Sequence, residues 1–258
     1  MIFTTGGRTD TEGKAEAKRI ANSLNIPFIE RKKQPLNEMM EKYRTPVIVA
    51  GKKRIECHTP GSEEPLFFHP NSAMFRVKRL LRGEADPFIE ACGIKSGTKL
   101  LDCTMGLGAD SMTASFAAGD RGKVTGIEEN SIVAFLTAAG LSGYESGLEE
   151  LDKAMRRVET VNCHHLDFLK SCSSGQYDVI YFDPMFEEEI LESSNFSPLK
   201  PLASYAPLLI ESVELAKKAA KERVVLKDHF RSGRFAELGF RQLKRKSAKF
   251  HYGVIDLQ

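Results

Sequence analysis

From residue 97 onward, the sequence alternates between short apolar runs and longer amphipathic segments. The apolar runs predict strands and the amphipathic segments predict helices. Parallel strands need a long crossover connection, usually a helix, so this alternation indicates β–α–β units and a mainly parallel sheet. We expect strands at 99–103, 124–128, 160–163, 178–183 and 223–227, and helices at 109–118, 130–141, 149–157, 204–221 and 231–237.

The end of the chain departs from this alternation. The stretch "FRQLKRKSAKFHYGVIDL" predicts two strands, at about 240–246 and 250–257, joined by a short polar turn. Two strands this close together can pair only antiparallel. We therefore expect a terminal antiparallel hairpin on the parallel sheet.

The first 65 residues predict a separate, small α/β unit. "MIFTT" and "IPFIER" have the composition of strands, and "TEGKAEAKRIANSLN" and "PLNEMMEKYR" that of helices. "PVIVAGKKRIECH" predicts a hairpin that turns at Gly51 and Lys52. The polar stretch "TPGSEEP" indicates a boundary, so we expect two parts, 1–65, which is a candidate to dock RNA, and 66–258.

Composition excludes several classes of protein. No apolar run is long enough for a transmembrane helix and the start lacks a signal-peptide pattern, so we expect a cytoplasmic protein with no membrane partner. Five irregularly spaced cysteines are typical of reduced thiols. The absence of CxxC and HExxH argues against a dedicated metal site.

Charge is distributed unevenly along the chain. Residues 1–90 carry 16 Lys and Arg against 12 Asp and Glu, residues 91–220 carry 11 against 19, and residues 221–258 carry 10 against 4. Basic ends around an acidic middle favour a surface for a polyanion. Solvated helices and hairpins carry basic residues too, so charge alone leaves both interpretations open.

The segment 69–83 predicts a helix with a basic face. A cap near Asn71 or Ser72 and a stop at Gly83 would frame it. Its periodicity places Met74, Val77, Leu80 and Leu81 inward, and Arg76, Lys78, Arg79 and Arg82 largely outward. A basic helix face is usually just solvated, but Arg76, Arg79 and Arg82 are candidates to contact nucleic-acid phosphates.

Ligands of open parallel sheets bind beyond the carboxyl ends of the strands. The first such strand of the large sheet ends at Asp102 and is followed by "TMGLGADS", in which Gly106 and Gly108 let the backbone approach a ligand and a helix begins near Ala109. The next strand ends in Glu128, whose spacing suits hydrogen bonds from two ribose hydroxyls. A solvated acidic turn is the alternative for Glu128.

The third strand runs into His165 and Asp167. A carboxylate at Asp167 could accept a hydrogen bond from an adenine amino group, and His165 could pack on the ring. Asp167 could equally cap a helix. The fourth strand, "VIYF", runs directly into Asp183, Pro184 and Phe186, which are unusual residues at the end of a buried strand.

These features together indicate a nucleoside, for which two cofactor classes compete. A dinucleotide loop requires GxGxxG, but Ser111 follows "GLGAD". Asp102 and Asp110 would repel a pyrophosphate, whereas they suit an ammonium or a sulfonium. S-adenosylmethionine carries both cations and no phosphate, so we expect this cofactor.

The motifs "LLDCTMGLGADS", "GIEEN" and "YFDPMF" resemble those of class I, Rossmann-like methyltransferases, whose sheet ends in an antiparallel strand. The D-x-T-x-G-x-G-x-D loop with D-P-M-F resembles, more narrowly, the family of ribosomal RNA small subunit methyltransferase J and its Gram-positive relatives. Thr104 stands where the common class I loop has its first glycine. The resemblance covers about residues 65–258 and implies methylation of guanine N2 in small-subunit ribosomal RNA.

The chemistry of an exocyclic amine explains the D-P-M-F motif. The lone pair of such an amine is delocalised into the ring, and two acceptors aimed at its N–H bonds can free it. Asp183 and the carbonyl of Pro184 are the candidate acceptors, and Phe186 can stack on an extruded base. Lys227 could contact the base or a phosphate, or could instead form a salt bridge with a carboxylate at the sheet edge.

Two alternatives to ribosomal RNA methylation remain. One is amino-group methylation of DNA, of a protein or of a small molecule. The other is a non-catalytic protein that binds the cofactor and docks on RNA. Intact Asp183, Pro184 and Phe186 argue against the second alternative.

Overall fold

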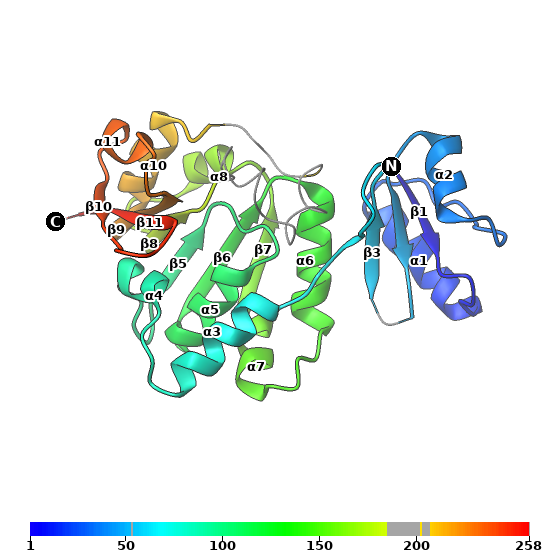
Figure 1. Ribbon diagram of the computed structural model, residues 1–258, viewed down its shortest axis with the longest axis horizontal. Coiled ribbons are helices and arrows are strands. Elements are labelled where there is room, and N and C mark those ends of the chain that lie inside the picture. Colours follow the sequence, from blue (N-terminus) through cyan, green and yellow to red (C-terminus); the bar gives the residue numbers. More distant parts are fainter. Residues whose placement is uncertain (53, 185–201, 203–206, 258) are drawn as a thin grey trace. The chain divides into compact units, whose positions relative to one another are not determined.

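The computed structural model describes residues 1–52, 54–184, 202 and 207–257 (Figure 1). Contacts within the chain divide it into two compact units. One is built on Met1–His69 and the other on Pro70–Glu189 together with Ser204–Gln258. We call them the N-terminal unit and the large unit.

The N-terminal unit has a four-stranded sheet in the order β1-β2-β3-β4. Strand β1 (Ile2–Thr5) is parallel to β2 (Val47–Ala50), and β2, β3 (Ile55–His58) and β4 (Leu66–Phe67) are antiparallel to one another in turn. Helices α1 (Thr11–Ser23) and α2 (Leu36–Tyr43) connect β1 to β2. The predicted hairpin at Gly51 and Lys52 is confirmed.

The strand predicted for "IPFIER" is reduced to one isolated bridge between Phe3 and Phe28. Phe3 donates to the Pro27 carbonyl at 2.9 Å and accepts from Ile29 at 2.8 Å, and no longer ladder follows in this part of the described chain. Pro27 has no N–H to donate, and Lys32 adopts a positive φ of 45° soon afterwards. The strand prediction was therefore wrong in length.

The large unit is built around a seven-stranded sheet in the order β10-β11-β9-β8-β5-β6-β7 (Figure 1). Its central strands are parallel, and β11 is antiparallel to both β9 and β10, which confirms the predicted terminal hairpin. The strands are β5 (Lys99–Asp102), β6 (Lys123–Glu128), β7 (Val158–Asn162), β8 (Tyr177–Phe182), β9 (Ala220–His229), β10 (Arg241–Leu243) and β11 (Phe250–Asp256).

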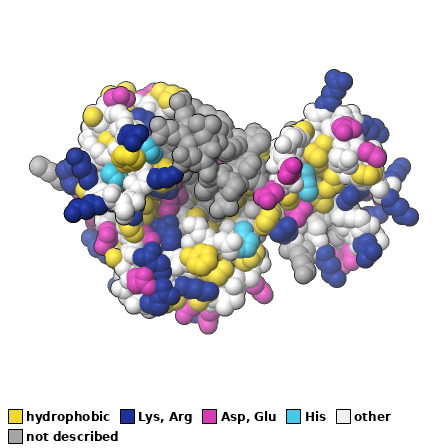
Figure 2. All heavy atoms as spheres, in the orientation of Figure 1, with side chains coloured by type: hydrophobic (Ala, Val, Ile, Leu, Met, Phe, Trp, Pro, Cys, Tyr) yellow, Lys and Arg dark blue, Asp and Glu magenta, His cyan; other side chains and the backbone are white. Residues whose placement is uncertain are grey.

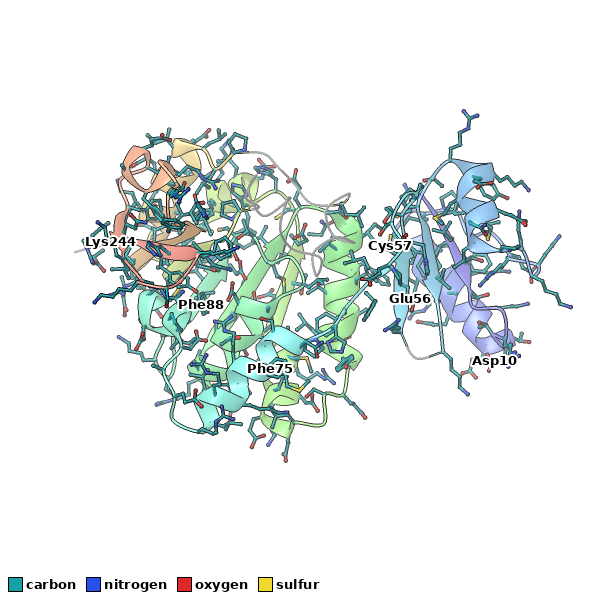
Figure 3. All side chains as sticks on the ribbon, viewed as in Figure 1. Asp10, Glu56, Cys57, Phe75, Phe88 and Lys244 are labelled. Atoms are coloured by element: carbon teal, nitrogen blue, oxygen red, sulfur yellow. The ribbon has the colours of Figure 1, made fainter. Side chains whose placement is uncertain are left out.

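Helices cover both faces of this sheet, which explains why residues 179–182 of β8 form a continuous apolar run. One core contains Phe182 with Leu169 and Val213, and the other contains Tyr181 with Phe88 and Ala114 (Figure 3 labels Phe88). The helices are α3 (Asn71–Leu81), α4 (Pro87–Cys92), α5 (Ala109–Ala118), α6 (Ser131–Gly143), α7 (Glu149–Arg157), α8 (His165–Ser171), α10 (Ile210–Ala219) and α11 (Arg234–Glu237).

Helices α5 and α7 have the predicted bounds, but the predicted helix 204–221 does not. Helix α10 begins at Ile210, and residues from Ala220 onward already belong to β9. Residues 204–206 of the predicted helix lie outside the described residues, and pairing with β8 draws the end of the segment into the sheet. The helix predicted at 231–237 is likewise shorter, at Arg234–Glu237.

Helix α3 differs from its prediction at both ends. Its N-cap residue is Pro70, which makes no side-chain cap, in place of Asn71 or Ser72. Leu81, predicted to face inward, is 47% exposed, while Val77 is fully buried as expected. Phe75 also projects outward (Figure 3). Among the described helices, none combines the length and the apolarity that crossing a bilayer requires.

Candidate active site

Four parallel strands of the large sheet bring charged side chains to one edge, at their carboxyl ends. Asp102 ends β5, Glu128 ends β6, Asp183 follows β8, and Lys227 lies near the end of β9. Strand β8 lies between β5 and β9, and Asp102 is in register with Tyr181. The topology thus gathers residues that are up to 125 positions apart in the sequence, from Asp102 to Lys227.

Asp102 is held in the interior beneath the loop that follows β5. Its carboxylate accepts a hydrogen bond from Ser111 Oγ at 2.6 Å and from the Thr104 N–H at 3.1 Å. Burial raises the pKa of Asp102 to about 7 despite these bonds, and the negative charge of Asp110 adds to the rise. A nearby cation would therefore favour its charged form.

The loop after β5 folds back on the end of β6. Gly106 and Gly108 have φ values of 53° and 78°, which residues other than glycine adopt at a cost. The Gly106 N–H donates to Glu128 Oε2 at 3.0 Å, and Thr137 Oγ1 donates to the Gly106 carbonyl at 2.8 Å. A Cβ on Gly106 would meet no protein atom within 4 Å, so open space lies on that side of the loop.

Glu128 is fixed by two backbone donors, since Asn130 N–H also donates to its Oε1 at 2.8 Å. Burial raises the pKa of Glu128 above its ordinary value, and the two backbone hydrogen bonds oppose that rise. Each carboxylate oxygen has two acceptor positions. Glu128 therefore retains the capacity to accept from two hydroxyls of a ribose, as its sequence position predicts.

His165 and Asp167 lie at the start of α8. His165 stacks on His164 with ring centroids 4.4 Å apart, meets Phe182 edge-on and contacts Ser212 Oγ at 3.2 Å. Burial lowers the pKa of His165 to about 4, so the ring is neutral at pH 7. Asp167 is exposed, and the cap of α8 is His164, which accepts from the Leu166 N–H. The alternative in which Asp167 caps the helix is therefore wrong.

Asp183 is held through both its backbone and its side chain. Its N–H donates to Thr104 Oγ1 at 2.6 Å, and its Oδ2 accepts from Lys227 Nζ at 2.5 Å. The threonine at the first glycine position of the loop thus anchors the residue at the end of the neighbouring strand. Pro184 is partly buried beside it, and Phe186 lies outside the described residues.

Lys227 forms the salt bridge that the sequence left as one of two alternatives. Besides Asp183, it lies 3.8 Å from Asp110 Oδ2. Burial by itself would lower the pKa of the Lys227 ammonium, but Asp183 and Asp110 outweigh burial and raise it. The ion pair favours the charged forms of both partners at neutral pH.

Arg76 faces the interior, so the prediction that it points outward is wrong. Its guanidinium binds Asp86 through two hydrogen bonds of 2.8 and 2.9 Å and donates a third to Asp110. Tyr181 donates to the other oxygen of Asp110 at 2.9 Å. Burial alone would raise the pKa of Asp110, but Lys227 and Arg76 hold it below its ordinary value.

Two other arginines, Arg79 in α3 and Arg82 at its C-cap, remain at the surface. Arg79 and Arg82 are exposed and both bind Glu84, with nitrogen–oxygen distances of 2.8 Å and 2.6 Å. Periodicity alone could not tell that Arg76 faces inward and Arg79 and Arg82 outward. The long side chain of an arginine at the margin of a helix face can point to the interior or to solvent. The signal available was the number of carboxylates at the sheet edge, which require cations when they are buried.

Sequence reasoning missed Thr104 and Tyr181 as parts of this site. Thr104 was noted only as a departure from a glycine pattern, yet its hydroxyl fixes Asp183. Tyr181 sits in β8 one position before Phe182, on the opposite face of the sheet, where it reaches Asp110. A tyrosine within an apolar strand was the available signal, since a buried hydroxyl needs a partner.

The charges around the Gly106 loop fit S-adenosylmethionine. Asp102 and Glu128, both largely buried, flank the loop and disfavour a phosphate there, while Gly106 leaves open space beside it. Carboxylates at this loop suit a nucleoside that carries an ammonium and a sulfonium. No group of three metal-ligating side chains occurs among the residues with described positions.

The fold and this site define the class: an S-adenosylmethionine-dependent methyltransferase with a Rossmann-like sheet. The family model described as "Putative SAM-dependent methyltransferase" matches residues 39–250, and the chain belongs to this family. A solved SAM-dependent methyltransferase from Neisseria gonorrhoeae has the same fold, with a TM-score of 0.65, 15% identity, and coverage of 98% of this chain and 95% of that one.

Curated relatives share longer stretches of sequence. The chain is 42% identical over 254 residues to "Uncharacterized protein YpiP" of Bacillus subtilis, covering 98% of each. It is 32% identical over 167 residues to ribosomal RNA small subunit methyltransferase J of Legionella pneumophila, covering 63% of this chain and 65% of that enzyme. The enzyme of the same name from Coxiella burnetii is 27% identical over 221 residues, covering 83% and 81%.

These comparisons confirm the predicted fold class, the enzymatic class and the cofactor. They also confirm the resemblance to the methyltransferase J family that the loop and the D-P-M-F motif indicated. The roles of individual residues and the methylated atom stay predictions.

Proposed function

We propose that this methyltransferase acts in the cytoplasm on an exocyclic amine of small-subunit ribosomal RNA, most specifically on guanine N2. Two relatives are named ribosomal RNA small subunit methyltransferase J, which supports the class of substrate. The observation that carries the choice of an amine is Asp183, followed by Pro184, held at the carboxyl edge of the sheet.

Asp183 is suited to act as a fixed hydrogen-bond acceptor. The Thr104 hydroxyl holds its backbone and Lys227 holds its carboxylate, so little reorganisation is needed when an amine arrives. A carboxylate offers about four acceptor positions, so binding Lys227 leaves capacity for an N–H of the substrate. Accepting from that N–H turns the nitrogen lone pair out of conjugation with the ring.

S-adenosylmethionine, when bound, supplies a methyl group made electrophilic by the adjacent sulfonium. Asp183 and the Pro184 carbonyl orient the amine, and Phe186 stacks on the base. The amine nitrogen gains the methyl group and becomes strongly acidic, so its surplus proton can pass to solvent without a dedicated base. Lys227 favours the charged carboxylate of Asp183, which supports its role as an acceptor instead of a proton carrier.

Glu128, Asp102 and the Gly106–Gly108 loop are proposed to hold the cofactor, with His165 and Asp167 near its base. Asp110 is proposed to act indirectly, because Arg76, Tyr181 and Lys227 already surround it. Arg79 and Arg82 are proposed to contact RNA phosphates, since both are exposed. For Arg76 the proposal changes from phosphate contact to support of the site.

Mass spectrometry of ribosomal RNA nucleosides from a deletion strain tests the proposal. We expect N2-methylguanosine to fall in small-subunit RNA, and site mapping to show one lost methyl group. A plasmid carrying the wild-type chain should restore it, and so should Asp120→Ala, which changes an exposed aspartate that pairs with Arg157 and, within the described chain, makes no contact with a site residue. Asp183→Ala should fail to restore it. Unchanged N2-methylguanosine with loss of a different methylated nucleoside would redirect the proposal to another amine.

A further inference from the structure

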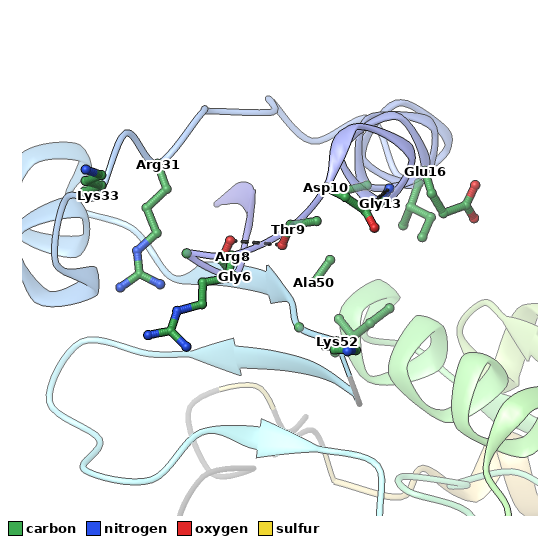
Figure 4. A pocket seen from close by; sticks show the side chains of 15 residues that line it. Gly6, Arg8, Thr9, Asp10, Gly13, Glu16, Arg31, Lys33, Ala50 and Lys52 are labelled. Carbon is green, nitrogen blue, oxygen red and sulfur yellow. Dashed lines mark hydrogen bonds between the residues drawn. The ribbon is translucent and has the colours of Figure 1, made fainter.

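The N-terminal unit contains a pocket of about 1030 Å³ that the methyltransferase chemistry does not use (Figure 4). It lies beside the loop between β1 and α1 and is also lined by the turn between β2 and β3. Pockets that hold small ligands or parts of larger ones measure about 300–1,000 Å³. The size of this pocket is therefore sufficient for a nucleotide.

Four basic side chains line this pocket: Arg8, Arg31, Lys33 and Lys52. They come from three separate segments of the chain. Figure 4 shows the guanidinium groups of Arg8 and Arg31 extending on the same side of the pocket. Residues distant in sequence thus present like charges to one space, and an anion bound there would be attracted by all of them.

Among the described residues, Arg8, Lys33 and Lys52 have no acidic partner, and neither do Lys18, Lys42 and Arg44 outside the pocket, so what sets the first three apart is that they line one space. Within the part of the chain that the structure describes, Arg8, Lys33 and Lys52 form no hydrogen bond or ion pair. Other basic residues of the same unit are paired: Lys14 with Glu30 at 2.9 Å, Arg19 with Glu16 at 2.6 Å and Arg54 with Glu56 at 2.7 Å.

The two acidic residues of the pocket are already engaged. Glu16 binds Arg19, and Asp10 caps α1 by accepting from the Gly13 N–H at 2.8 Å. The N-terminus of α1 is therefore already capped by Asp10. The part of the pocket that can attract an anion is formed by the basic side chains.

A turn from Arg31 to Gln34 places two of the cations, Arg31 and Lys33, at the pocket. Arg31 and Gln34 close a turn with a 2.8 Å hydrogen bond, and Lys32 and Lys33 between them have φ values of 45° and 67°. Lysine adopts this region less readily than glycine or asparagine. Arg31 also donates from Nε to the Gln34 carbonyl at 2.8 Å, which orients its guanidinium.

We propose that this pocket binds a phosphodiester group of the RNA substrate. The proposal rests on the proposed function for the identity of the polymer, while the pocket itself identifies the chemistry as phosphate. Arg8, Lys33 and Lys52 are exposed at an open rim. A free nucleotide is usually enclosed by its site, whereas exposed cations around an open pocket suit a chain that passes across it.

A binding experiment on the full-length protein tests this proposal. The pocket variant carries Arg8→Gln, Lys33→Gln and Lys52→Gln. The control variant carries Lys18→Gln, Lys42→Gln and Arg44→Gln, which removes three charges from the same unit at residues that do not line the pocket. The probe is a labelled transcript of small-subunit ribosomal RNA, titrated at several salt concentrations.

We expect the pocket variant to bind the transcript about tenfold more weakly than the control variant at low salt. The slope of log affinity against log salt should fall by about 2, because roughly 0.7 of an ion is released for each contact to single-stranded RNA. Affinity for S-adenosylhomocysteine should be equal in the wild type, the pocket variant and the control variant, which would show that the large unit is intact.

A further variant tests whether the volume of the pocket matters, without changing its charge. A Cβ on Gly7 would meet no protein atom within 4 Å, and Gly7 lines the pocket, so Gly7→Leu should fold and narrow it. We expect it to lower RNA affinity severalfold while cofactor affinity is unchanged.

Equal losses in the pocket and control variants would overturn the proposal. Binding of ADP or inorganic phosphate at micromolar concentration, abolished in the pocket variant while RNA affinity is unchanged, would assign the pocket to a small phosphate ligand instead. Because the readout is binding, it is independent of methyl transfer. If the deletion strain keeps its N2-methylguanosine, the proposed function fails while the pocket result remains.

Discussion

The edge of the large sheet and the pocket of the N-terminal unit both gather charged side chains, but in opposite ways. At the sheet edge, Arg76 and Lys227 are partly buried and bound to Asp86, Asp110 and Asp183. In the pocket, Arg8, Lys33 and Lys52 are exposed and, in the described chain, lack partners. Figure 2 shows basic side chains projecting from the surface of the N-terminal unit.

This difference separates two uses of charge. Buried and paired groups have fixed positions, so they can orient a reacting atom without reorganising. Exposed and unpaired cations are mobile, and they suit a polyanion whose own counterions they displace. The contrast predicts that changes at the sheet edge affect rate and stability, whereas changes in the pocket affect only RNA affinity and its salt dependence.

The largest expected effect is on Asp183. Asp183→Ala should lower the single-turnover rate at least a thousandfold with the fold intact, because the amine loses its fixed acceptor. Asp183→Asn should be milder, since an amide oxygen still accepts one hydrogen bond. Rates measured with a matched ribosomal RNA transcript distinguish an Asp183 that accepts a hydrogen bond from an Asp183 that acts as a base. Equal and complete loss in both variants, with cofactor binding unchanged, would mean that Asp183 acts as a base.

Arg76 tests the energetic side of the comparison. Arg76→Gln should lower the free energy of unfolding by about 3–5 kcal/mol, because buried Asp86 would lose its cation and Asp110 would keep only Lys227. Arg79→Gln on the same helix should change it by less than about 1 kcal/mol, since Arg79 is exposed. Denaturant unfolding measures both.

The pocket provides a further control for Arg76. Lys33→Gln in the N-terminal unit should behave like Arg79→Gln, because Lys33 is exposed and has no partner among the described residues. A loss from Arg76→Gln as small as that from Lys33→Gln would remove the distinction between the two regions.

Asp102 should make stability depend on pH. Its pKa is raised from the ordinary 3.8 to about 7, so the folded state holds the proton more tightly than the unfolded chain. That stabilisation is complete below about pH 4 and is lost as the pH rises through about 7. Over roughly three pH units at about 1.4 kcal/mol each, it amounts to at most about 4 kcal/mol.

Unfolding of the wild type and of Asp102→Asn across pH 4–8 measures this contribution, with the pH range taken from the pKa shift. We expect the difference in unfolding free energy between wild type and variant to fall as the pH rises. A difference that is constant with pH would show that Asp102 does not titrate in this range.

The smallest of these effects is expected at Glu128. Glu128→Ala should weaken S-adenosylhomocysteine binding by about 1–3 kcal/mol, because hydrogen bonds to a charged acceptor are lost. Glu129→Ala is the matched control, since Glu129 is the exposed neighbour of the same type. Calorimetry that finds the two variants equal would remove Glu128 from the cofactor site.

The sequence by itself determined the architecture of the large unit. The apolar runs and amphipathic segments located all seven strands and set α5 and α7 at their observed bounds, because hydrophobic period follows local backbone geometry. The position of Asp183 after a buried strand and of glycines after another placed the candidate site at one edge, since parallel strands end together.

Only the tertiary structure decided which charges meet. Lys227 binds Asp183 although 44 positions separate them, and Arg76 reaches Asp110 across 34 positions. It also showed that Thr104 holds Asp183, and that Arg8, Lys33 and Lys52 surround one pocket. Pairing of charges depends on distance and burial, and both arise only when strands and helices that are far apart in the sequence have packed.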